Sequence, residues 1–581
     1  MYEYNVTNRK DYGSLYPNVW DLIAFSAVII VLVLIARSVH DMVAPEPTVN
    51  LEKIDLSVMA LPGYALQSFI RMFVALFFSL LVTFVLGTLA ARSAAAEALI
   101  IPMIDILQSI PILGYLTIAA TIFLRFSPYQ SMGFEIIALF AIFTSQVWNM
   151  ILSFYQSLRC VPANLQEFSA VFQLTRLQKF WRVDVPYAMP DLLLSMMVSL
   201  SQGWFYVVYS EAIPRSADSA HTILLPGIGS YMWMANQEGN SHALMYAVIA
   251  MFVVILFYDQ MIFRPLMHFV RNYQAEEDDG GITRSWMVTF VYRTQWFRAA
   301  LGFLRHLFAQ FLTYTVRYSR KARSPESIAS YYAKPWPWYG QAFLLGIALY
   351  MAVQMAYLVA ENMVINEVAL MIFLGACTCL RVFALIIICL LIWVPIGVWI
   401  GFRPRVAYRS LPVIQFLAAF PPNLFYPMLM EIIFLYQLNV DIWCAPLMIL
   451  GTQWYILFNV IAAVRAIPKE VIHAVNNFGV SGWLRWRRLI LPSIAPHLVT
   501  GAMAASGGAW NASIAAEVIS WGGRVERATG LGAYIADAHI HGSVNSHIWA
   551  ILVMCLYVVL INRLFWYPLY RYTEKHFAQA G

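Results

Sequence analysis

Four ionisable residues lie inside long apolar segments of this sequence. Arg71 and Arg381 stand near the start of two such segments, and Glu211 and Glu517 stand near the end of two others. An ionised side chain inside a bilayer is costly, so such residues are usually functional or paired. We therefore predict an Arg71–Glu211 ion pair, mirrored by an Arg381–Glu517 pair, in the outer half of a membrane. The alternative is that these pairs only hold helices together.

Amide and indole side chains near the middle of the apolar segments form a second group of candidates. Amides can bind a small oxyanion without the cost of a buried charge. The candidates for a translocation path are Gln146, Gln202, Trp204, Gln453, Trp510 and Asn511, with Gln108, Asn149, Gln415 and Asn459 beside them. Polar side chains also join membrane helices to one another, and we expect about half of these residues to do only that.

One group of residues has the side chains of a metal site but not its spacing. Asp537, His539, His541 and His547 precede the last apolar segment. His539 and His541 are two positions apart, whereas a helical metal site uses an i, i+4 pair. We expect a solvated loop here and predict no metal site.

The composition places these residues in a membrane. With 61% hydrophobic residues, 12% charged residues and a mean hydropathy of +0.66, the chain is too apolar for a soluble globular protein. A helix of about 20 residues crosses a bilayer core, and we predict twelve such spans in an all-α membrane protein. They cover 19–38, 64–91, 99–124, 133–158, 187–212 and 243–265, then 339–361, 371–400, 410–436, 442–464, 493–518 and 547–569.

The two sets of six spans are copies of one module. Residues of the first set recur 306 positions later, with offsets of 310 upstream and 303 downstream. Pro162, Val183, Pro186, Pro190, Trp204 and Glu211 correspond in this way to Pro468, Leu489, Pro492, Pro496, Trp510 and Glu517. Because each copy has six spans, both enter the membrane in the same orientation. We predict two tandem repeats related by a pseudo-twofold axis along the membrane normal.

These repeats define the expected domains. The first half is 1–265 with its core at 64–265, and the second half is 339–581 with its core at 371–570. Between them, 266–338 forms a linker whose stretch 286–316 mixes aromatic residues with arginines, as an amphipathic helix on the cytoplasmic leaflet does. A further crossing there is disfavoured, because each of its three arginines would cost about 2.5 to 3.5 kcal/mol.

Basic residues indicate which loops face the cytoplasm. They crowd the loops after the fourth and tenth spans, as Arg159, Arg176, Lys179 and Arg182, and as Arg465, Lys469, Arg485, Arg487 and Arg488. By the positive-inside rule these loops and both termini are cytoplasmic. Each loop is predicted to hold a short helix, a turn and a basic, aromatic segment that ends at Pro186 or Pro492. Such a displayed helix is suited to docking into a groove on a partner.

The two loops resemble a signature of type I ABC importer permeases, which depend on a binding protein. That signature is Glu-Ala-Ala, three residues, Gly, nine residues, then Ile-x-Leu-Pro. The second loop reads His473-Ala474-Val475, three residues, Gly479, nine residues and Leu489-Ile490-Leu491-Pro492. The first reads Glu167-Phe168-Ser169, three residues, Gln173, nine residues and Val183-Asp184-Val185-Pro186. Each copy departs from the pattern: the first keeps Glu167 but has Gln173 for the glycine, and the second keeps Gly479 but has His473 for the glutamate.

The resemblance implies that each loop carries a coupling helix, which sits in a cleft of a cytoplasmic ATPase subunit. The residues placed there are Glu167, Ala170, Gln173 and Pro186, and His473, Ala474, Gly479 and Pro492. The sequence has no Gly-Lys dipeptide and so no phosphate-binding loop of the Walker type. The chain is therefore expected to be a transport subunit rather than an enzyme, with no cofactor of its own. Two partner ATPases would bind the ATP and Mg²⁺, and no nucleic-acid partner is expected.

A second similarity concerns the substrate. Ala515-Ala516-Glu517 followed by Gly530-Leu531-Gly532 is similar to the nitrate, sulfonate and taurine branch of these permeases. The resemblance thus implies import of a small anion, bicarbonate-like ions included, delivered by an extracytoplasmic binding protein across a bacterial or archaeal inner membrane. Another solute, such as an amino acid, a polyamine or a metal chelate, is the alternative. An ion-gradient transporter would need neither the parallel repeat nor two docking loops.

Overall fold

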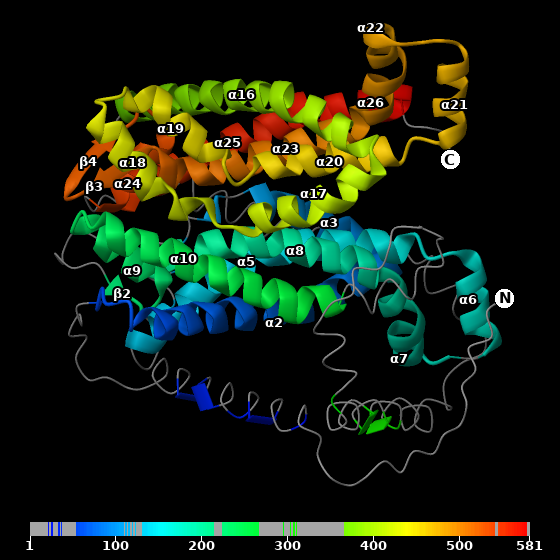
Figure 1. Cartoon of the computed structure of the whole chain (residues 1–581), viewed down its shortest axis with the longest axis horizontal. Helices are drawn as coiled ribbons and strands as arrows, with labels where there is room; N and C mark the ends of the chain where they lie inside the picture. The colour runs from blue at the N-terminus through cyan, green and yellow to red at the C-terminus, as the bar shows by residue number, and fades with distance from the viewer. Residues whose placement is uncertain are drawn as a thin grey trace. The chain divides into compact units, whose positions relative to one another are not determined.

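The computed structural model describes residues 54–109, 130–172, 174–213, 223–266, 365–540 and 544–577, with isolated positions elsewhere. Most of these residues are helical (Figure 1). The chain divides into two compact units. The larger unit comprises Met42–Cys160, Asp191–Phe257 and Pro325–Gly581, and the smaller one comprises Met1–Asp41, Val161–Pro190 and Tyr258–Ser324.

The elements of the first half follow the chain in one order. They are α2 (Leu61–Arg92), α3 (Ala94–Ser109), α5 (Gln130–Arg159), α6 (Ala163–Val171), α7 (Arg176–Lys179), η1 (Phe180–Asp184), α8 (Val185–Ser210), β1 (Ala212–Ile213), β2 (Ile223–Leu224), α9 (Ile228–Gln237), α10 (Ser241–Tyr258) and η2 (Asp259–Phe263). In this series η1 and η2 are π-helical turns.

The second half repeats the order, and many boundaries fall at the expected offset. Its elements are α16 (Ile365–Gly401), α17 (Pro404–Ala419), η3 (Pro422–Leu424), α18 (Tyr426–Leu435), α19 (Val440–Ile449), α20 (Gln453–Arg465), α21 (Lys469–Asn477), α22 (Gly482–Arg485), η4 (Trp486–Ile490), α23 (Leu491–Ala516), β3 (Val518–Trp521), β4 (Arg524–Arg527), α24 (Leu531–Ile540), α25 (Val544–Ile561), η5 (Asn562–Trp566) and α26 (Tyr567–Phe577). The sequence repeat is thus a repeat of structure.

Four π-helical turns share one sequence cause. Each of η1, η2, η4 and η5 ends two residues before a proline, namely Pro186, Pro265, Pro492 or Pro568. Proline has no N–H for the i→i−4 bond and its ring crowds the preceding turn, and a wider π turn relieves both problems without ending the helix. Helices α8 and α23 therefore continue without interruption from η1 and η4. The predicted spans 187–212 and 493–518 instead begin just after Pro186 and Pro492.

Seven described helices are long and apolar enough to cross a membrane. They are Leu61–Arg92, Met132–Arg159, Arg176–Ser210, Ser241–Leu266, Glu367–Gly401, Gly482–Ala516 and Asn545–His576. Each coincides with a predicted span. The predicted span 339–361, most of 19–38 and most of the linker 266–338 lie outside the described residues, and of 99–124 only isolated positions are described after Ser109.

Two predicted spans are not single straight helices. The span 410–436 consists of α17 and α18, bent by 65° at Pro421 and Pro422, and 442–464 consists of α19 and α20, bent by 44°. With these pairs counted as one span each, the described residues hold up to nine crossings. The two breaks lie together, because a Cβ on Gly451 would stand 2.8 Å from the Pro422 ring. The prolines remove N–H donors from the turn, which interrupts the helix.

The prediction of an entirely helical chain also needs a correction. A two-stranded antiparallel hairpin follows each of the helices α8 and α23, formed by β1 with β2 and by β3 with β4. The N–H of Leu225 donates to the carbonyl of Glu211 at 2.8 Å, and the N–H of Ala528 donates to that of Glu517 at 2.9 Å. These hairpins supply backbone partners to residues just past the helix ends, where four carbonyls lack intrahelical donors.

Glycine permits close helix packing at one equivalent position in each half. Gly87 of α2 faces Phe154 of α5, and its repeat equivalent Gly397 of α16 faces Val460 of α20. An added Cβ would lie 2.8 Å from a side-chain carbon of Phe154 or Val460, both fully buried. Small residues allow membrane helices to approach closely and to pack by van der Waals contact.

We expect Gly87→Ala and Gly397→Ala each to lower the unfolding free energy by about 1 to 3 kcal/mol, because the added methyl group overpacks a buried interface. Gly63→Ala is the matched control, since a Cβ there meets nothing within 4 Å and alanine favours helix. Thermal melting of the purified chain in detergent measures both. Equal melting of Gly87→Ala and Gly63→Ala would contradict the packing role of Gly87.

Candidate functional site

The predicted pair of Arg71 and Glu211 is present in the larger unit. Arg71 lies on α2, Glu211 follows the end of α8, and the distance from Arg71 Nη1 to Glu211 Oε1 is 2.8 Å. Both side chains have 0% exposure. Arg71 Nη1 also donates to the carbonyl of Pro226 at 2.8 Å. The pair therefore joins α2 to the end of α8 and to the turn before α9.

The carboxylate of Glu211 has further donors. Ser68 Oγ donates to Oε1 at 2.6 Å, and the N–H of Gly229 donates to Oε2 at 2.7 Å. A Cβ at Gly227 would overlap the Glu211 carboxylate, and one at Gly229 would overlap the carbonyl of Val208. The Gly-Ile-Gly sequence thus lets the backbone approach a buried carboxylate closely.

The second half contains the same constellation. Arg381 Nη1 lies 2.6 Å from Glu517 Oε1, and Thr378 Oγ1 donates to that oxygen at 2.8 Å. The N–H of Ala533 donates to Glu517 Oε2 at 3.1 Å. A Cβ at Gly532 would lie 2.6 Å from the carbonyl oxygen of Ser513, so this glycine is also required. Both predicted ion pairs are confirmed, each with a hydroxyl and a backbone N–H as additional donors.

A second acidic residue, not predicted from the sequence, accompanies each arginine. Glu135 of α5 accepts from Arg71 Nε at 2.7 Å and from Nη2 at 2.6 Å, as a bidentate pair. Asp441 of α19 lies 3.5 Å from Arg381 Nη2, and its side chain is 48% exposed. The offset of 306 relates Glu135 to Asp441, so a search for acidic residues repeated at that spacing would have found both.

The geometry determines what these clusters can do in this conformation. Glu211 and Glu517 are fully buried, and their oxygens face arginine, hydroxyl and backbone donors of the protein. Paired and hydrogen-bonded in this way, the charges no longer carry the full cost of burial. The clusters act as ties between helices. Contact with a substrate would require a conformation in which one of these ties opens.

The amide and indole candidates are mostly enclosed by protein. Trp204 and Gln146 have 0% exposure and Trp510 has 1%. Gln146 Nε2 donates to the sulfur of Met72 at 3.2 Å, and the Trp510 ring stacks on Tyr557.

Three further candidates are partly exposed. Gln453 accepts from Trp393 Nε1 at 3.1 Å, and Asn511 Oδ1 accepts from the N–H of Ile112 at 2.9 Å. Gln202 is half-buried. The bonds of Gln453 and Asn511 join helices, and a place in a translocation path stays a prediction for all of the amide and indole candidates.

The predicted short helices of the two loops are confirmed as α6 and α21. Glu167 and Ala170 on α6 are exposed, and so are His473 and Ala474 on α21. Gly479, just after α21, has a φ of +66°, a left-handed conformation that favours glycine. Gln173 lies outside the described residues. Pro186 and Pro492 are half-buried and follow the π turns η1 and η4.

The expected solvated loop before the last span is wrong for its described part, because Asp537 lies in helix α24 and His547 is buried in α25. His547 lies in α25 with its two ring nitrogens 3.1 Å from the carbonyl oxygens of Ile535 and Gly114, and Asp537 binds Arg527. No group of three potential metal ligands occurs among the described residues. His541 and the side chain of His539 are outside them.

Loss of the buried carboxylate should be costly. We expect Glu211→Gln to lower the unfolding free energy by about 3 to 5 kcal/mol, because it leaves the Arg71 charge buried with a weaker partner set. Glu97→Gln is the matched control: it breaks an Arg159–Glu97 pair whose side chains are 54% and 30% exposed, and should cost about 1 kcal/mol or less. Chemical unfolding of both variants in detergent micelles decides. Similar losses for the two would count against a buried tie.

The second acidic residues, Glu135 and Asp441, should contribute differently to stability in the two halves. We expect Glu135→Gln to cost about 2 to 3 kcal/mol, because it replaces two charge-assisted hydrogen bonds. Asp441→Asn, which changes the net charge equally, should cost about 1 kcal/mol or less because its contact with Arg381 is long and the Asp441 side chain is 48% exposed. The same unfolding measurement applies, and a greater loss for Asp441→Asn would reverse our ranking.

The chain matches one protein family twice. The family is described as binding-protein-dependent transport system inner membrane component, and the matches cover residues 83–262 and 393–574. Each match contains a coupling-like loop; the first also contains Glu135 and Glu211 of the first ion-pair cluster, and the second contains Asp441 and Glu517 of the second.

Individual relatives are distant. The nitrate import permease protein of Leptolyngbya laminosa is 23% identical over 164 residues, which are 28% of this chain and 53% of that protein. The bicarbonate transport system permease protein of a Synechocystis strain is 29% identical over 168 residues, 29% of this chain and 56% of that protein. A putative aliphatic sulfonates transport permease protein of Bacillus subtilis is 26% identical over 170 residues, 29% of this chain and 55% of that protein.

The chain thus spans little more than half the length of these relatives. The two family matches, in contrast, together cover more than half of this chain. The chain therefore belongs to the family of binding-protein-dependent transport system inner membrane components, and carries its domain twice.

Proposed function

We propose that this chain forms the translocation path of an ATP-driven importer for a small anion of the nitrate, sulfonate, taurine or bicarbonate kind. The observation that carries the proposal is the duplicated family domain, each copy with an exposed short helix after its fourth predicted span. The permeases of nitrate, bicarbonate and sulfonate systems among its relatives support the anion. An extracytoplasmic binding protein would deliver it.

The exposed helices are the proposed sites for two ATPase subunits. Phe172, at the end of α6, is 63% exposed, and its repeat equivalent Phe478, at the end of α21, is 83% exposed. Large apolar side chains in water favour burial against a partner. In this proposal the partners bind ATP and Mg²⁺, and their closure moves both helices together.

The two docking sites are unequal in detail. Gly479 supplies the left-handed turn after α21, whereas the first copy has Gln173 at that position. The first copy keeps Glu167 where the second has His473. Unequal contacts would allow the two ATPase subunits to be held with different affinities.

The ion-pair clusters are proposed to stabilise one state of the transport cycle. Arg71 and Glu211 tie α2 to the segment between α8 and α9, and Arg381 and Glu517 do so in the second half. A transporter needs at least two conformations of similar free energy. A compact, paired cluster at the predicted outer side would favour the state in which these helix ends are together.

Orientation and location complete the proposal. The arginines around α22 and η4 predict a cytoplasmic position for the second coupling loop, and with it for both termini. The family description supports an inner membrane. A reporter that is active only in the cytoplasm, fused after the C-terminal residue, would test this orientation.

Removal of the two exposed phenylalanines should weaken ATPase binding selectively. We expect Phe172→Ser with Phe478→Ser to reduce co-purification of the ATPase at least about tenfold, because burial of each side chain contributes roughly 1.5 to 3 kcal/mol. Stability of the isolated chain should stay unchanged, since both side chains are already in water. Val525→Ser is the matched control: Val525 is 45% exposed on β4, on the predicted outer side. Full retention of the ATPase by the double variant would contradict docking at these helices.

Uptake by the reconstituted complex tests the transport itself. Vesicles that contain the chain, the ATPase and the binding protein should accumulate labelled nitrate, bicarbonate or taurine only with ATP. Accumulation that persists without the ATPase would exclude the importer, whereas ATP-dependent uptake of a cationic or neutral solute alone would exclude the anion.

A further inference from the structure

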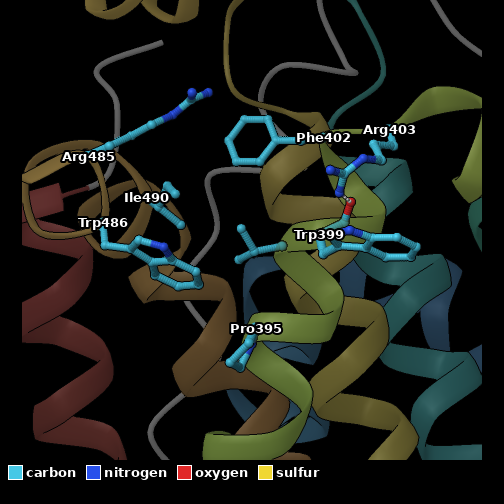
Figure 2. Close-up of a pocket in the computed structure, with 8 residues that line it drawn as sticks. Pro395, Trp399, Phe402, Arg403, Arg485, Trp486 and Ile490 are labelled. Atoms are coloured by element: carbon cyan, nitrogen blue, oxygen red, sulfur yellow. Dashed lines mark hydrogen bonds between the residues drawn. The ribbon is translucent and has the colours of Figure 1, made fainter. Parts of the chain in front are cut away.

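A pocket of about 490 Å³ lies beside the end of the long helix α16. It is lined by Pro395, Val398, Trp399, Phe402, Arg403, Arg485, Trp486 and Ile490 (Figure 2). The lining comes from two segments, the last turns of α16 with the residues after it, and α22 with η4. Its volume is within the range of small-molecule sites.

The pocket is positively charged. The guanidinium of Arg403 lies 4.8 Å from the ring of Trp399, and that of Arg485 lies 5.0 Å from the ring of Phe402. Within the part of the chain that the structure describes, neither arginine forms an ion pair with a carboxylate. The segments 402–409 and 482–490 contain six arginines and no acidic residue. One N–H of Arg403 donates to the carbonyl of Trp399 at 3.3 Å (Figure 2), which leaves its charge, like that of Arg485, available to an anion.

The other side of the pocket is apolar and continues onto a bilayer-facing surface. Pro395, Val398 and Ile490 carry no polar side-chain group, and Ile490 is buried. One to two turns earlier on α16, Leu391 is 71% exposed and Ile392 is 48% exposed, as expected of a span that faces lipid. Tryptophan is typical of the boundary between hydrocarbon and headgroups, and Trp399, 51% exposed, stands there.

The first half keeps a cation and an aromatic ring at two of these positions, Lys179 for Arg485 and Phe180 for Trp486, but differs at three others. By the repeat offsets, Leu89 corresponds to Trp399, Ser93 to Arg403 and Asp184 to Ile490. One tryptophan and one arginine are thus absent, and an acidic residue takes the place of an apolar one. Because the fold of the repeat forms without this set of residues, its presence in the second half calls for a separate role.

We propose that this pocket binds an anionic phospholipid of the adjoining leaflet, predicted to be the cytoplasmic one. The headgroup phosphate binds Arg403 and Arg485, and the glycerol and first acyl carbons contact Trp399, Trp486 and Ile490. Basic pockets at this depth bind anionic headgroups because the phosphate satisfies the cations and the acyl chains stay in the bilayer. A free phosphate ion could use the same arginines but would leave the apolar wall unused, which favours the lipid.

Retention of lipid by the purified full chain tests the proposal. The chain is exchanged into micelles doped with phosphatidylglycerol or phosphatidylcholine, and bound lipid is counted by native mass spectrometry. We expect phosphatidylglycerol to be retained in preference to phosphatidylcholine. Arg403→Gln and Arg485→Gln should each weaken retention roughly fivefold, and the double variant about thirtyfold, in line with the contribution of one basic residue at an anionic surface.

Arg487→Gln is the matched control. Arg487 belongs to η4, is exposed and does not line the pocket, so its loss changes the net charge equally and should leave retention within about twofold. The pair Arg403→Lys with Arg485→Lys keeps both charges and should keep most of the binding. Melting curves check that every variant is folded, and the single variants decide if the double variant fails to fold.

Three results would overturn the proposal. Equal retention of phosphatidylglycerol by the wild type and by a folded Arg403→Gln variant would show that Arg403 does not bind the headgroup. Retention of phosphatidylcholine equal to that of phosphatidylglycerol would show that the pocket does not select anionic lipids. Displacement of the lipid by millimolar inorganic phosphate would assign the pocket to a free anion. None of these measurements needs the ATPase or a transported solute, so they stand apart from the test of import.

Discussion

A buried arginine inside a membrane protein dictates its surroundings. Arg71 and Arg381 are tolerable only because a carboxylate, a hydroxyl and backbone groups meet them and their partners at bonding distance. The requirement extends outward from the pairs. Glycine is needed at Gly229 and Gly532, where the backbone comes close to the glutamate and to the preceding helix. A hairpin follows each of the two helices that lead into these glutamates.

Duplication makes the differences between halves informative. Glu135 binds Arg71 through both oxygens in a buried setting, whereas the side chain of Asp441 is one methylene group shorter and half exposed beside Arg381. The second half also has a sharp break at Pro421 and Pro422. The second ion-pair cluster is therefore the more hydrated of the two, and the same scaffold holds one firm and one looser tie.

The sequence predicted the parts that follow from rare or periodic residues. Charged residues are scarce in apolar segments, so Arg71 and Glu211 could be matched before any coordinates, and the repeat offset identified α6 and α21. Other features need three dimensions. A proline pair indicates an interruption but not a bend of 65°, and the pocket joins residues near 399 to residues near 485, which no local pattern relates. Glu135 was not predicted because pairing each arginine with a single carboxylate already balances its charge, whereas Arg71 has two carboxylate partners.

The four π turns give the long helices an unexpected mechanical property. A π turn holds one more residue than an α turn, so its conversion to α geometry would twist the segment before it by about 100° without ending the helix. The turns η1 and η4 stand between a coupling-like helix and a membrane-spanning helix in each repeat. Conversion of η1 or η4 to α geometry would therefore rotate the loop that carries the coupling-like helix about the axis of the membrane-spanning helix.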